Sequence, residues 1–251
     1  GKQYFERHPA SPLQTYRQAR KLWTSFESRV GKLGRLSNTL DGWHVACQDA
    51  DQEKVFWRVD DGTILCDTAG DSNHDYVWLM SDRTFADFEL EMDIQVYRDV
   101  TGNSGVQVRS RYDYDAGWLD GPQIDVDPRA GWRTGLIYDE TRETRRWICP
   151  SLVNWKIDSS AAAPGWTWYY ADEQDAWNSL RIRCRGTRIQ TWVNGTPISD
   201  FDGTGVLDDS DHQQHGVGLD GHIALQLHKN DDLRIRYRRI RVCPRVPKSD
   251  Q

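Results

Sequence analysis

The chain has 251 residues, of which 37% are hydrophobic, and a formal net charge of −6 at pH 7. All-β sandwiches and barrels often reach about 200–250 residues as one domain, so a single large core is possible. The negative charge disfavours nucleic acid and anionic membranes as partners, because both would repel an acidic protein. The apolar stretches are strand-sized, far from the roughly 20 residues that cross a bilayer, so we expect no membrane-spanning segment.

Composition also bears on the compartment and on the ligand. No signal peptide opens the sequence, so we expect that any secretory signal has been removed. Five cysteines without C-x-x-C spacing argue against a zinc ribbon or redox motif, and their odd number leaves at least one thiol free. The 12 Trp residues suit the flat apolar faces of sugars, and the many arginines suit oxygen acceptors, although a sandwich core also uses Trp.

The N-terminal segment has the pattern of one amphipathic helix. Ser11 is a suitable N-cap, Pro12 fits the first helical position, and Gln14 completes a capping box. Gly31 is a plausible end of the helix. The apolar positions between them recur at steps of three and four, namely Leu13, Tyr16, Ala19, Trp23, Phe26 and Val30. We predict that this helix flanks the main domain.

From about residue 41 the apolar period changes to two, and turn signals recur at short intervals, which is typical of an all-β domain. The predicted hairpin turns are Asp61-Gly62, Arg185-Gly186 and Asn194-Gly195. The predicted organisation is a helical extension over 1–36, an antiparallel β-sandwich over 37–245 and a tail over 246–251.

Two later segments depart from simple alternation. The stretch from Trp147 to Trp177 has no clear period, and we interpret it as an excursion or lid over one end of the sandwich. In the last strand, Leu233 and Tyr237 have one parity, whereas Ile240 and Val242 have the other. This slip predicts a β-bulge near Arg238-Arg239.

Strand alternation places an unusual set of polar side chains on faces away from the core, because successive residues point to opposite sides of a sheet. They come from the predicted strands 105–111, 123–127 and 222–228. The side chains are Gln107, Arg109, Arg111, Gln123, Asp125, Asp127, Gln226 and His228. If these strands are neighbours, they form a groove suited to a polyhydroxylated ligand, although polar outer faces are also the norm for half-buried sheets.

Short motifs in a fixed order resemble one known family. They are Asp41-Gly42-Trp43, Phe56-Trp57-Arg58-Val59, Phe85-Ala86-Asp87-Phe88-Glu89-Leu90, Gly102-Asn103-Ser104-Gly105-Val106, Gly121-Pro122-Gln123-Ile124-Asp125, Gly135-Leu136-Ile137-Tyr138-Asp139-Glu140, Trp177-Asn178, Trp192-Val193-Asn194-Gly195, and Gly221-His222-Ile223-Ala224-Leu225-Gln226-Leu227-His228. Over residues 41 to 243 the chain resembles the 3-keto-disaccharide hydrolase domain family. Many members carry Glu and Gln where this chain has Gln123 and Asp125.

The resemblance implies a concanavalin A-like jelly roll, bacterial export to a secreted or periplasmic location, and cleavage of glycosides whose sugar carries a ketone at C3. That ketone acidifies the C2 proton, so the reaction needs a base at C2, an electrophile at the C3 oxygen and an acid for the leaving oxygen. We expect His228 or Asp125 as the base, and Glu140 or Tyr138 as the acid.

The remaining roles concern binding. We expect Arg109 or a bound divalent cation at the enolate oxygen, and Asn103, Gln123 and Gln226 at the sugar hydroxyls. A metal is chemically reasonable because it would polarise the ketone. His212-x-x-His215 matches no known ligand pattern, so no metal ligands are assigned, and a divalent metal ion is the one cofactor that the sequence suggests.

Two alternatives remain open. An endo-glycosidase of the same fold could use the carboxylates of Glu89, Glu91 and Asp93, which share one face of a strand, although their spacing differs from the Glu-x-Asp-x-x-Glu pattern of those enzymes. A non-catalytic sugar-binding module is the second alternative, because sandwiches of this shape have many lectin-like functions.

Overall fold

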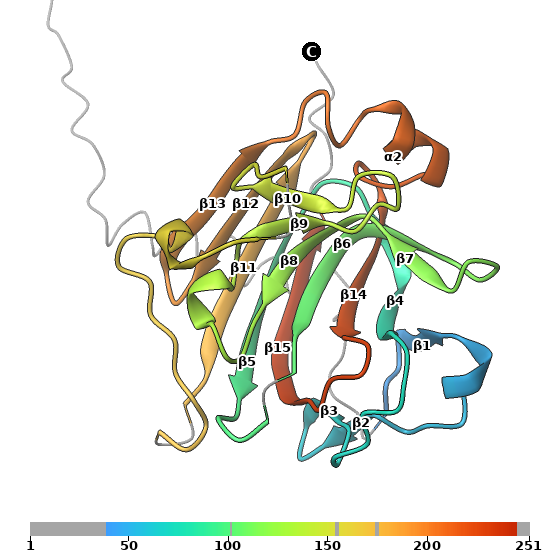
Figure 1. Cartoon of the computed structure of the whole chain (residues 1–251), viewed down its shortest axis with the longest axis vertical. Helices are drawn as coiled ribbons and strands as arrows, with labels where there is room; N and C mark the ends of the chain where they lie inside the picture. The colour runs from blue at the N-terminus through green and yellow to red at the C-terminus, as the bar shows by residue number, and fades with distance from the viewer. Residues whose placement is uncertain (1–38, 101, 154–155, 174–175, 245–251) are drawn as a thin grey trace, which may run out of the picture. The chain divides into compact units, whose positions relative to one another are not determined.

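A computed structural model describes residues 39–244 except residues 101, 154–155 and 174–175. The predicted N-terminal helix and the predicted tail lie outside the described residues. The described part is an antiparallel β-sandwich of two sheets, as the alternation and the family resemblance predicted (Figure 1). It also contains the short helices η1 (Asp49–Asp51), η2 (Gly131–Arg133), η3 (Ser159–Ala161) and α2 (Ser210–His215).

The first sheet, here called sheet A, has eight strands within the described residues. In spatial order they are β1 (Trp43–Cys47), β4 (Val77–Phe85), β14 (Gly221–Leu227), β6 (Ser104–Asp113), β8 (Pro122–Val126), β9 (Ile137–Asp139) and β10 (Arg146–Cys149), with β7 (Trp118–Asp120) paired to β6. Strands distant in sequence are therefore neighbours, since β14 lies between β4 and β6.

The second sheet, sheet B, has seven strands in the same part of the chain. Their order is β13 (Thr196–Asp202), β12 (Arg188–Val193), β11 (Asn178–Arg185), β5 (Phe88–Val96), β15 (Arg234–Pro244), β3 (Thr63–Asp67) and β2 (Trp57–Asp60). Figure 1 shows sheet A in front and sheet B behind it.

The core lies between the two sheets and consists of the residues whose parity predicted it. Val106 and Val108 of β6 and Ile124 and Val126 of β8 are completely buried. Ile223, Leu225 and Leu227 of β14 are buried with them. The side chains that alternate with these residues are therefore committed to the outer face of sheet A, where the candidate site lies.

Two of the predicted hairpin turns are confirmed. Asp61 and Gly62 connect β2 to β3 with φ of 46° and 66°, and Asn194 and Gly195 connect β12 to β13 with φ of 49° and 80°. Two positive φ values in a two-residue loop are the signature of a type I′ turn. The third turn is displaced by one residue, because Arg185 pairs with Arg188 and the loop is Gly186-Thr187.

The bulge predicted in the last strand is also confirmed. The pairing of β15 with β5 shifts between Arg238 and Arg241, and Arg239 has φ of 52°. The Trp147–Trp177 connection contains η3 and little other regular structure among its described residues. Leu152 and Ile157 from this connection pack against Tyr138 and Trp147 beside the edge of sheet A. No disulfide joins any two of the five cysteines, which all lie in the described part of the chain.

Candidate active site

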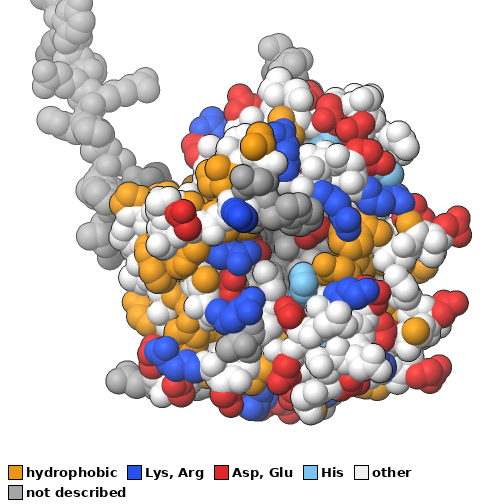
Figure 2. All heavy atoms as spheres, in the orientation of Figure 1, with side chains coloured by type: hydrophobic (Ala, Val, Ile, Leu, Met, Phe, Trp, Pro, Cys, Tyr) orange, Lys and Arg blue, Asp and Glu red, His pale blue; other side chains and the backbone are white. Residues whose placement is uncertain are grey.

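The strands of sheet A bring most of the predicted polar residues together on its outer face. Gln107 of β6 pairs directly with Ala224 of β14 and with Gln123 of β8, and Gln123 pairs in turn with Tyr138 of β9. One row of side chains thus crosses four strands. Figure 2 shows that charged and histidine side chains surround a hollow in the face formed by these strands.

The next row contains Asp125 and Gln226, with Gly105 of β6 between their strands. Gly105 pairs with Asp125, and Leu225 pairs with Val106, which places Gln226 beside Gly105. A Cβ atom at position 105 would collide with the side chain of Gln123. The absence of a side chain at position 105 therefore provides the space that the Gln123 side chain occupies.

His228 follows β14 directly and is oriented by three hydrogen-bonding groups. Its Nδ1 lies 3.1 Å from the carbonyl oxygen of Lys229 and 3.3 Å from Oδ2 of Asp231. Its Nε2 lies 3.1 Å from the hydroxyl oxygen of Tyr76. Two acceptors at Nδ1 favour the tautomer in which Nδ1 carries the proton and Nε2 presents its lone pair.

Electrostatics make His228 more basic than an isolated imidazole. Burial alone would lower its pKa, but the hydrogen bond and the charge of Asp231, with a contribution from Glu140, outweigh burial and raise the pKa. Asp231 is itself held by the backbone N–H of Asn103 at 2.7 Å. His228 and Asp231 therefore form an oriented base with a fixed partner.

Asp125 is a nearly completely buried carboxyl group, with 2% of its surface exposed. Burial raises its pKa to about 7, even though Arg133 lies 3.1 Å away and lowers it. Asp127 competes for the same guanidinium, at 2.8 Å from Nη1 of Arg133. A hydrogen bond from the Asn103 side chain favours the charged form of Asp125.

Glu140 is the second buried carboxyl group of this face. Burial raises its pKa to about 7, while the charges of Arg145 and His228 oppose that rise. Its backbone is fixed because Glu140 N–H donates to the Gly121 carbonyl and Trp118 Nε1 donates to the Glu140 carbonyl at 2.8 Å. Two carboxyl groups are thus each poised between their acid and base forms near neutral pH.

Tyr138 and the amide side chains complete the face. Burial raises the pKa of the Tyr138 phenol, and its ring packs edge-on against Trp147 at 5.3 Å between centroids. Several buried amide atoms have no hydrogen-bond partner among the described residues, namely Oδ1 of Asn103, Oε1 of Gln123 and both polar atoms of Gln226. Buried amides of this kind suit the donors and acceptors of a sugar ring.

A buried ion pair supports β9 from behind the site. Nε2 of His212 lies 3.1 Å from Asp139, and Nδ1 lies 2.8 Å from Asp209, which caps α2. Burial would lower the pKa of His212, but Asp139 and Asp209 raise it to about 9. Asp139 lies between Tyr138 and Glu140 in sequence, so this pair fixes the strand that carries both.

Arg109 does not lie with these residues, which corrects the prediction from strand parity. Val108 and Arg109 bulge opposite Ile223, and Arg109 has φ of 52°. Its guanidinium is fully buried and donates to the carbonyl oxygens of Ala86, Gly186 and Gly218 and to Asp87. Arg109 therefore ties loops together at one end of the sandwich and is not available to an enolate on the outer face of sheet A.

Four further residues that act on the site were not predicted from the sequence, namely Tyr76, Asp231, Arg133 and Arg145. Only Asp231 had a local signal, because it lies three residues after His228 in a turn. The others come from separate strands or loops, and only the strand order brings them to the site. Tyr76 belongs to an aromatic cluster in which its ring stacks on Trp78 at 5.5 Å and meets Trp118 edge-on at 5.0 Å.

The described residues contain no group of three His, Cys, Asp or Glu side chains that could hold a metal ion. Asp125 faces Arg133, and Nδ1 of His228 faces the Lys229 carbonyl and Asp231. This donor set does not fit a divalent cation. No helix in the described part of the chain is long and apolar enough to cross a membrane.

The carboxylates of the endo-glycosidase alternative lie on the other sheet. Glu89, Glu91 and Asp93 are on β5 of sheet B, whose strands do not pair with those of sheet A. Glu89 accepts a hydrogen bond from Arg183 at 3.0 Å, and Asp93 lies between Arg238 and Arg239. Two of the three are therefore neutralised by arginines.

Comparisons with solved structures support the fold. A candidate glycosyl hydrolase from Parabacteroides distasonis ATCC 8503 is 14% identical, with 82% of this chain and 89% of that chain covered and a TM-score of 0.51. A second structure is described as "Prominent members of the human gut microbiota express endo-acting O-glycanases to initiate mucin breakdown". It is 13% identical, with 86% and 98% of the two chains covered and a TM-score of 0.50. At these identities the likeness concerns the fold alone.

Among curated proteins, none matches the sequence. The sequence does match the family described as the 3-keto-alpha-glucoside-1,2-lyase-like domain over residues 34–243, a range that contains the described strands of both sheets apart from Pro244, the last residue of β15. The motifs of the sequence analysis and the residues of the candidate site fall within this range. The chain belongs to the 3-keto-alpha-glucoside-1,2-lyase-like domain family.

Proposed function

We propose that this protein cleaves the glycosidic bond of 3-keto glycosides by removing the C2 proton, expelling the group at C1 and adding water. Family membership supports a sugar substrate. One observation carries the mechanism: an imidazole oriented by Asp231 lies on the same face as two buried carboxyl groups with pKa values of about 7.

In the first step His228 is the base. Its Nε2 lone pair takes the proton from C2, and the electron pair of that C–H bond forms the C2=C3 enolate with the negative charge on O3. Asp231 stabilises the imidazolium that results, because its carboxylate lies 3.3 Å from Nδ1. We assign the base to His228 and not to Asp125, since Arg133 engages the Asp125 carboxylate.

In the second step Glu140 is the acid. The enolate electron pair returns to form the C1=C2 bond, the C1–O bond breaks, and the leaving oxygen takes the proton of Glu140. Water then adds at C1 while a proton returns to C2, so the net reaction is hydrolysis. If the product leaves before water adds, the same chemistry gives a lyase.

The enolate oxygen needs hydrogen-bond donors other than Arg109. The Gln226 amide has both polar atoms unpaired within the described residues and lies in the row next to Gln123. We assign Gln226 to O3 and Asn103 and Gln123 to the other hydroxyls. Asp125, whose pKa is about 7, donates a hydrogen bond to the sugar when it is protonated.

The pH dependence follows from these roles. The base must be unprotonated, so the rate falls as the pH decreases through the pKa of His228, which Asp231 raises. The acid must be protonated, so the rate falls as the pH rises through about 7, the pKa of Glu140. A narrow bell-shaped dependence of the rate on pH, centred near neutrality, is expected. Because His228 and Glu140 interact, the two apparent pKa values of this profile belong to the pair.

Mass spectrometry of the purified full chain tests this proposal, with a 3-keto glucoside and the unmodified glucoside compared in D₂O. We expect turnover of the keto form alone and one deuterium at C2 of the released sugar. Without the ketone the C2 proton is too weakly acidic for an imidazole. Equal rates on both substrates would favour the endo-glycosidase, and binding without turnover of either would favour a sugar-binding module.

A further inference from the structure

Arg133 of the candidate active site is shared between two buried carboxyl groups. Asp125 lies in β8, and Asp127 follows the end of this strand. The two residues are 2% and 1% exposed. Nε of Arg133 lies 3.1 Å from Oδ2 of Asp125, and Nη1 lies 2.8 Å from Oδ2 of Asp127. One positive charge therefore serves two acidic groups.

The two contacts of Arg133 differ in kind. The contact with Asp127 is a hydrogen bond, in which Nη1 donates to Oδ2. The contact with Asp125 is not aligned as a hydrogen bond, because neither Arg133 Nε nor Asp125 Oδ2 has a hydrogen-bond partner among the described residues. Asp125 thus receives the charge of Arg133 without its hydrogen bond, and Oδ2 of Asp125 can still carry a proton.

Asp127 is fixed independently of Arg133. Its Oδ1 accepts hydrogen bonds from the backbone N–H groups of Arg129 and Ala130, at 2.9 and 3.0 Å. Its own N–H donates to Oγ1 of Thr134 at 3.3 Å. The exposed side chain of Arg129 adds only a longer contact of 3.8 Å. Because the turn holds the Asp127 carboxylate, the position of Asp127 determines where the Arg133 guanidinium lies.

Three further groups face Asp125 from other parts of sheet A. The Asn103 side chain donates a hydrogen bond to it, and the charge of His228 lowers its pKa. Glu140 is close enough that the charge of Asp125 raises the pKa of Glu140. None of these three groups contacts Arg133 in the described structure. Asp127 is the group that both raises the pKa of Asp125 and holds the arginine.

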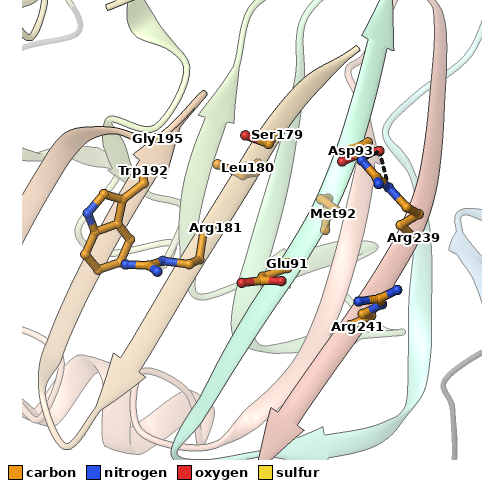
Figure 3. Close-up of a pocket in the computed structure, with 10 residues that line it drawn as sticks. All are labelled: Glu91, Met92, Asp93, Ser179, Leu180, Arg181, Trp192, Gly195, Arg239 and Arg241. Carbon is orange, nitrogen blue, oxygen red and sulfur yellow. Dashed lines mark hydrogen bonds and ion pairs between the residues drawn. The ribbon is translucent and has the colours of Figure 1, made fainter. Parts of the chain in front are cut away.

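Sheet B has the opposite ratio of arginine to carboxylate. Asp93 of β5 accepts hydrogen bonds from Arg238 at 3.0 Å and from Arg239 at 2.5 Å. Figure 3 shows the Arg239 side chain of β15 reaching to Asp93. Two arginines there bind one carboxylate, whereas Arg133 has two carboxyl groups beside it. Loss of the Asp127 charge would give Asp125 an arginine of its own.

We infer that Asp127 is a positioning residue of the proposed reaction, which holds the Arg133 guanidinium and so leaves Asp125 able to carry the proton that it donates to the sugar. The role of Asp125 in this inference rests on the proposed function. Without the Asp127 charge, Arg133 turns to Asp125 and forms an aligned ion pair, which stabilises the carboxylate over the acid. Asp125 then loses its proton at a lower pH and can no longer donate.

Carbon-13 NMR of the carboxyl groups in the full chain tests this inference. The Asp125 signal is identified by its absence from Asp125→Asn. Asp127→Asn keeps an oxygen acceptor for the turn. In this variant the titration midpoint of Asp125 should move to lower pH by about one unit or more. Asp127→Asn combined with Arg133→Gln should return the midpoint to about 7 or higher, because Arg133 is the largest influence that lowers it.

Steady-state kinetics on a 3-keto glucoside give a second readout. A shift of one unit lowers the protonated fraction of Asp125 at pH 8 by about tenfold, so the KM of Asp127→Asn should rise by about tenfold there. At pH 5 its KM should match that of wild type, and kcat should change little at either pH. Asp202→Asn is the matched control, because Asp202 at the end of β13 accepts from the Thr204 N–H at 3.1 Å in a turn of sheet B. It should change neither the Asp125 midpoint nor KM.

The two readouts separate this inference from the proposed function. If the wild-type chain shows no turnover, the proposed function fails, while the NMR titration still tests the effect of Asp127 on Asp125. A midpoint of Asp125 that does not move in Asp127→Asn would overturn the inference. A KM raised equally at pH 5 and pH 8, or a double variant that does not recover, would also overturn it, since either result indicates damage to the turn.

Discussion

The outer faces of the two sheets both carry carboxyl groups beside arginines, but the electrostatic environments of these carboxyl groups differ. On sheet B, the carboxylates of Glu89 and Asp93 each lie within 3.0 Å of an arginine nitrogen. On sheet A, Asp125 shares Arg133 with Asp127, and burial raises the pKa values of Asp125 and Glu140 to about 7. Carboxylates that are neutralised by arginine serve packing or binding, whereas carboxylates that burial holds near neutrality can transfer protons.

The largest effect that this comparison predicts is on turnover. His228→Ala and Glu140→Gln should each reduce kcat on a 3-keto glucoside by about 10²–10⁴-fold, which is the usual contribution of a general base or acid. Asp93→Asn, on sheet B, should leave kcat unchanged. A comparable loss in Asp93→Asn would show that the two faces do not differ as their ion pairs indicate.

The second prediction concerns the ion pair behind β9. His212→Ala leaves Asp139 buried without its partner, so the free energy of unfolding should fall by about 3 kcal/mol. The folded pKa of His212 is about 9, above its usual 6.5, so the stabilisation is complete below pH 6.5 and is lost as the pH rises through 9.

Urea unfolding at pH 6 and pH 10 measures this effect, and the loss should be larger at pH 6. His44→Ala is the matched control, because His44 pairs with Asp82 at 2.7 Å but both side chains are exposed. Exposed pairs contribute about 0–1 kcal/mol. A loss in His212→Ala no larger than that of His44→Ala would contradict a supporting role for the buried pair.

The third prediction concerns the cost of keeping Asp125 buried. Its folded pKa of about 7 exceeds the ordinary value of 3.8, so the folded state binds more protons between these two values and stability decreases as the pH rises across them. Asp125→Asn removes this dependence. The variant should be more stable than wild type at pH 8, by on the order of 2 kcal/mol, and show little difference at pH 4.

Asp231→Asn should change the pH dependence of folding stability in the opposite direction. The hydrogen bond from His228 outweighs burial and lowers the pKa of Asp231, so its contribution is present above the unfolded pKa and is lost as the pH falls through the folded pKa. Denaturant unfolding across pH 4–8 compares the two variants. If the Asp125→Asn variant is no more stable than wild type at pH 8, Arg133 neutralises Asp125 fully.

The sequence predicted those features that depend on local rules. Strand parity placed Val106, Ile124 and Ile223 in the core, the Asn194-Gly195 dipeptide predicted its turn, and the parity slip at Arg238-Arg239 predicted the bulge. Each of these follows from the chemistry of a few consecutive residues.

The features that the sequence did not predict depend on pairing between distant strands. Alternation placed Arg109 with Gln107, but the bulge opposite Ile223 turns its side chain into the sandwich, and no turn residue marks that bulge. Tyr76 reaches His228 only because β4 and β14 are neighbours across about 150 residues of chain. Alternation identifies the residues that share a face, and only the strand order identifies which faces meet.

The smallest predicted effect concerns the hydrogen bond between Tyr76 and the proposed base, His228. When Nδ1 of His228 carries the proton, the Tyr76 hydroxyl, 3.1 Å from Nε2, donates to it, so it stabilises the neutral imidazole and competes with proton uptake. Tyr76→Phe should therefore raise the pKa of His228, move the acid limb of the kcat profile to higher pH, and lower kcat at pH 6 by about two- to tenfold, the worth of one hydrogen bond.

Tyr112→Phe is the matched control, because Tyr112 contacts Trp78 in the same aromatic cluster and no described contact joins it to His228. Full pH–rate profiles of both variants distinguish the outcomes. An acid limb that does not move in Tyr76→Phe would mean that Nε2 of His228 is not the atom that accepts the C2 proton, and Asp125 would then be the base to test.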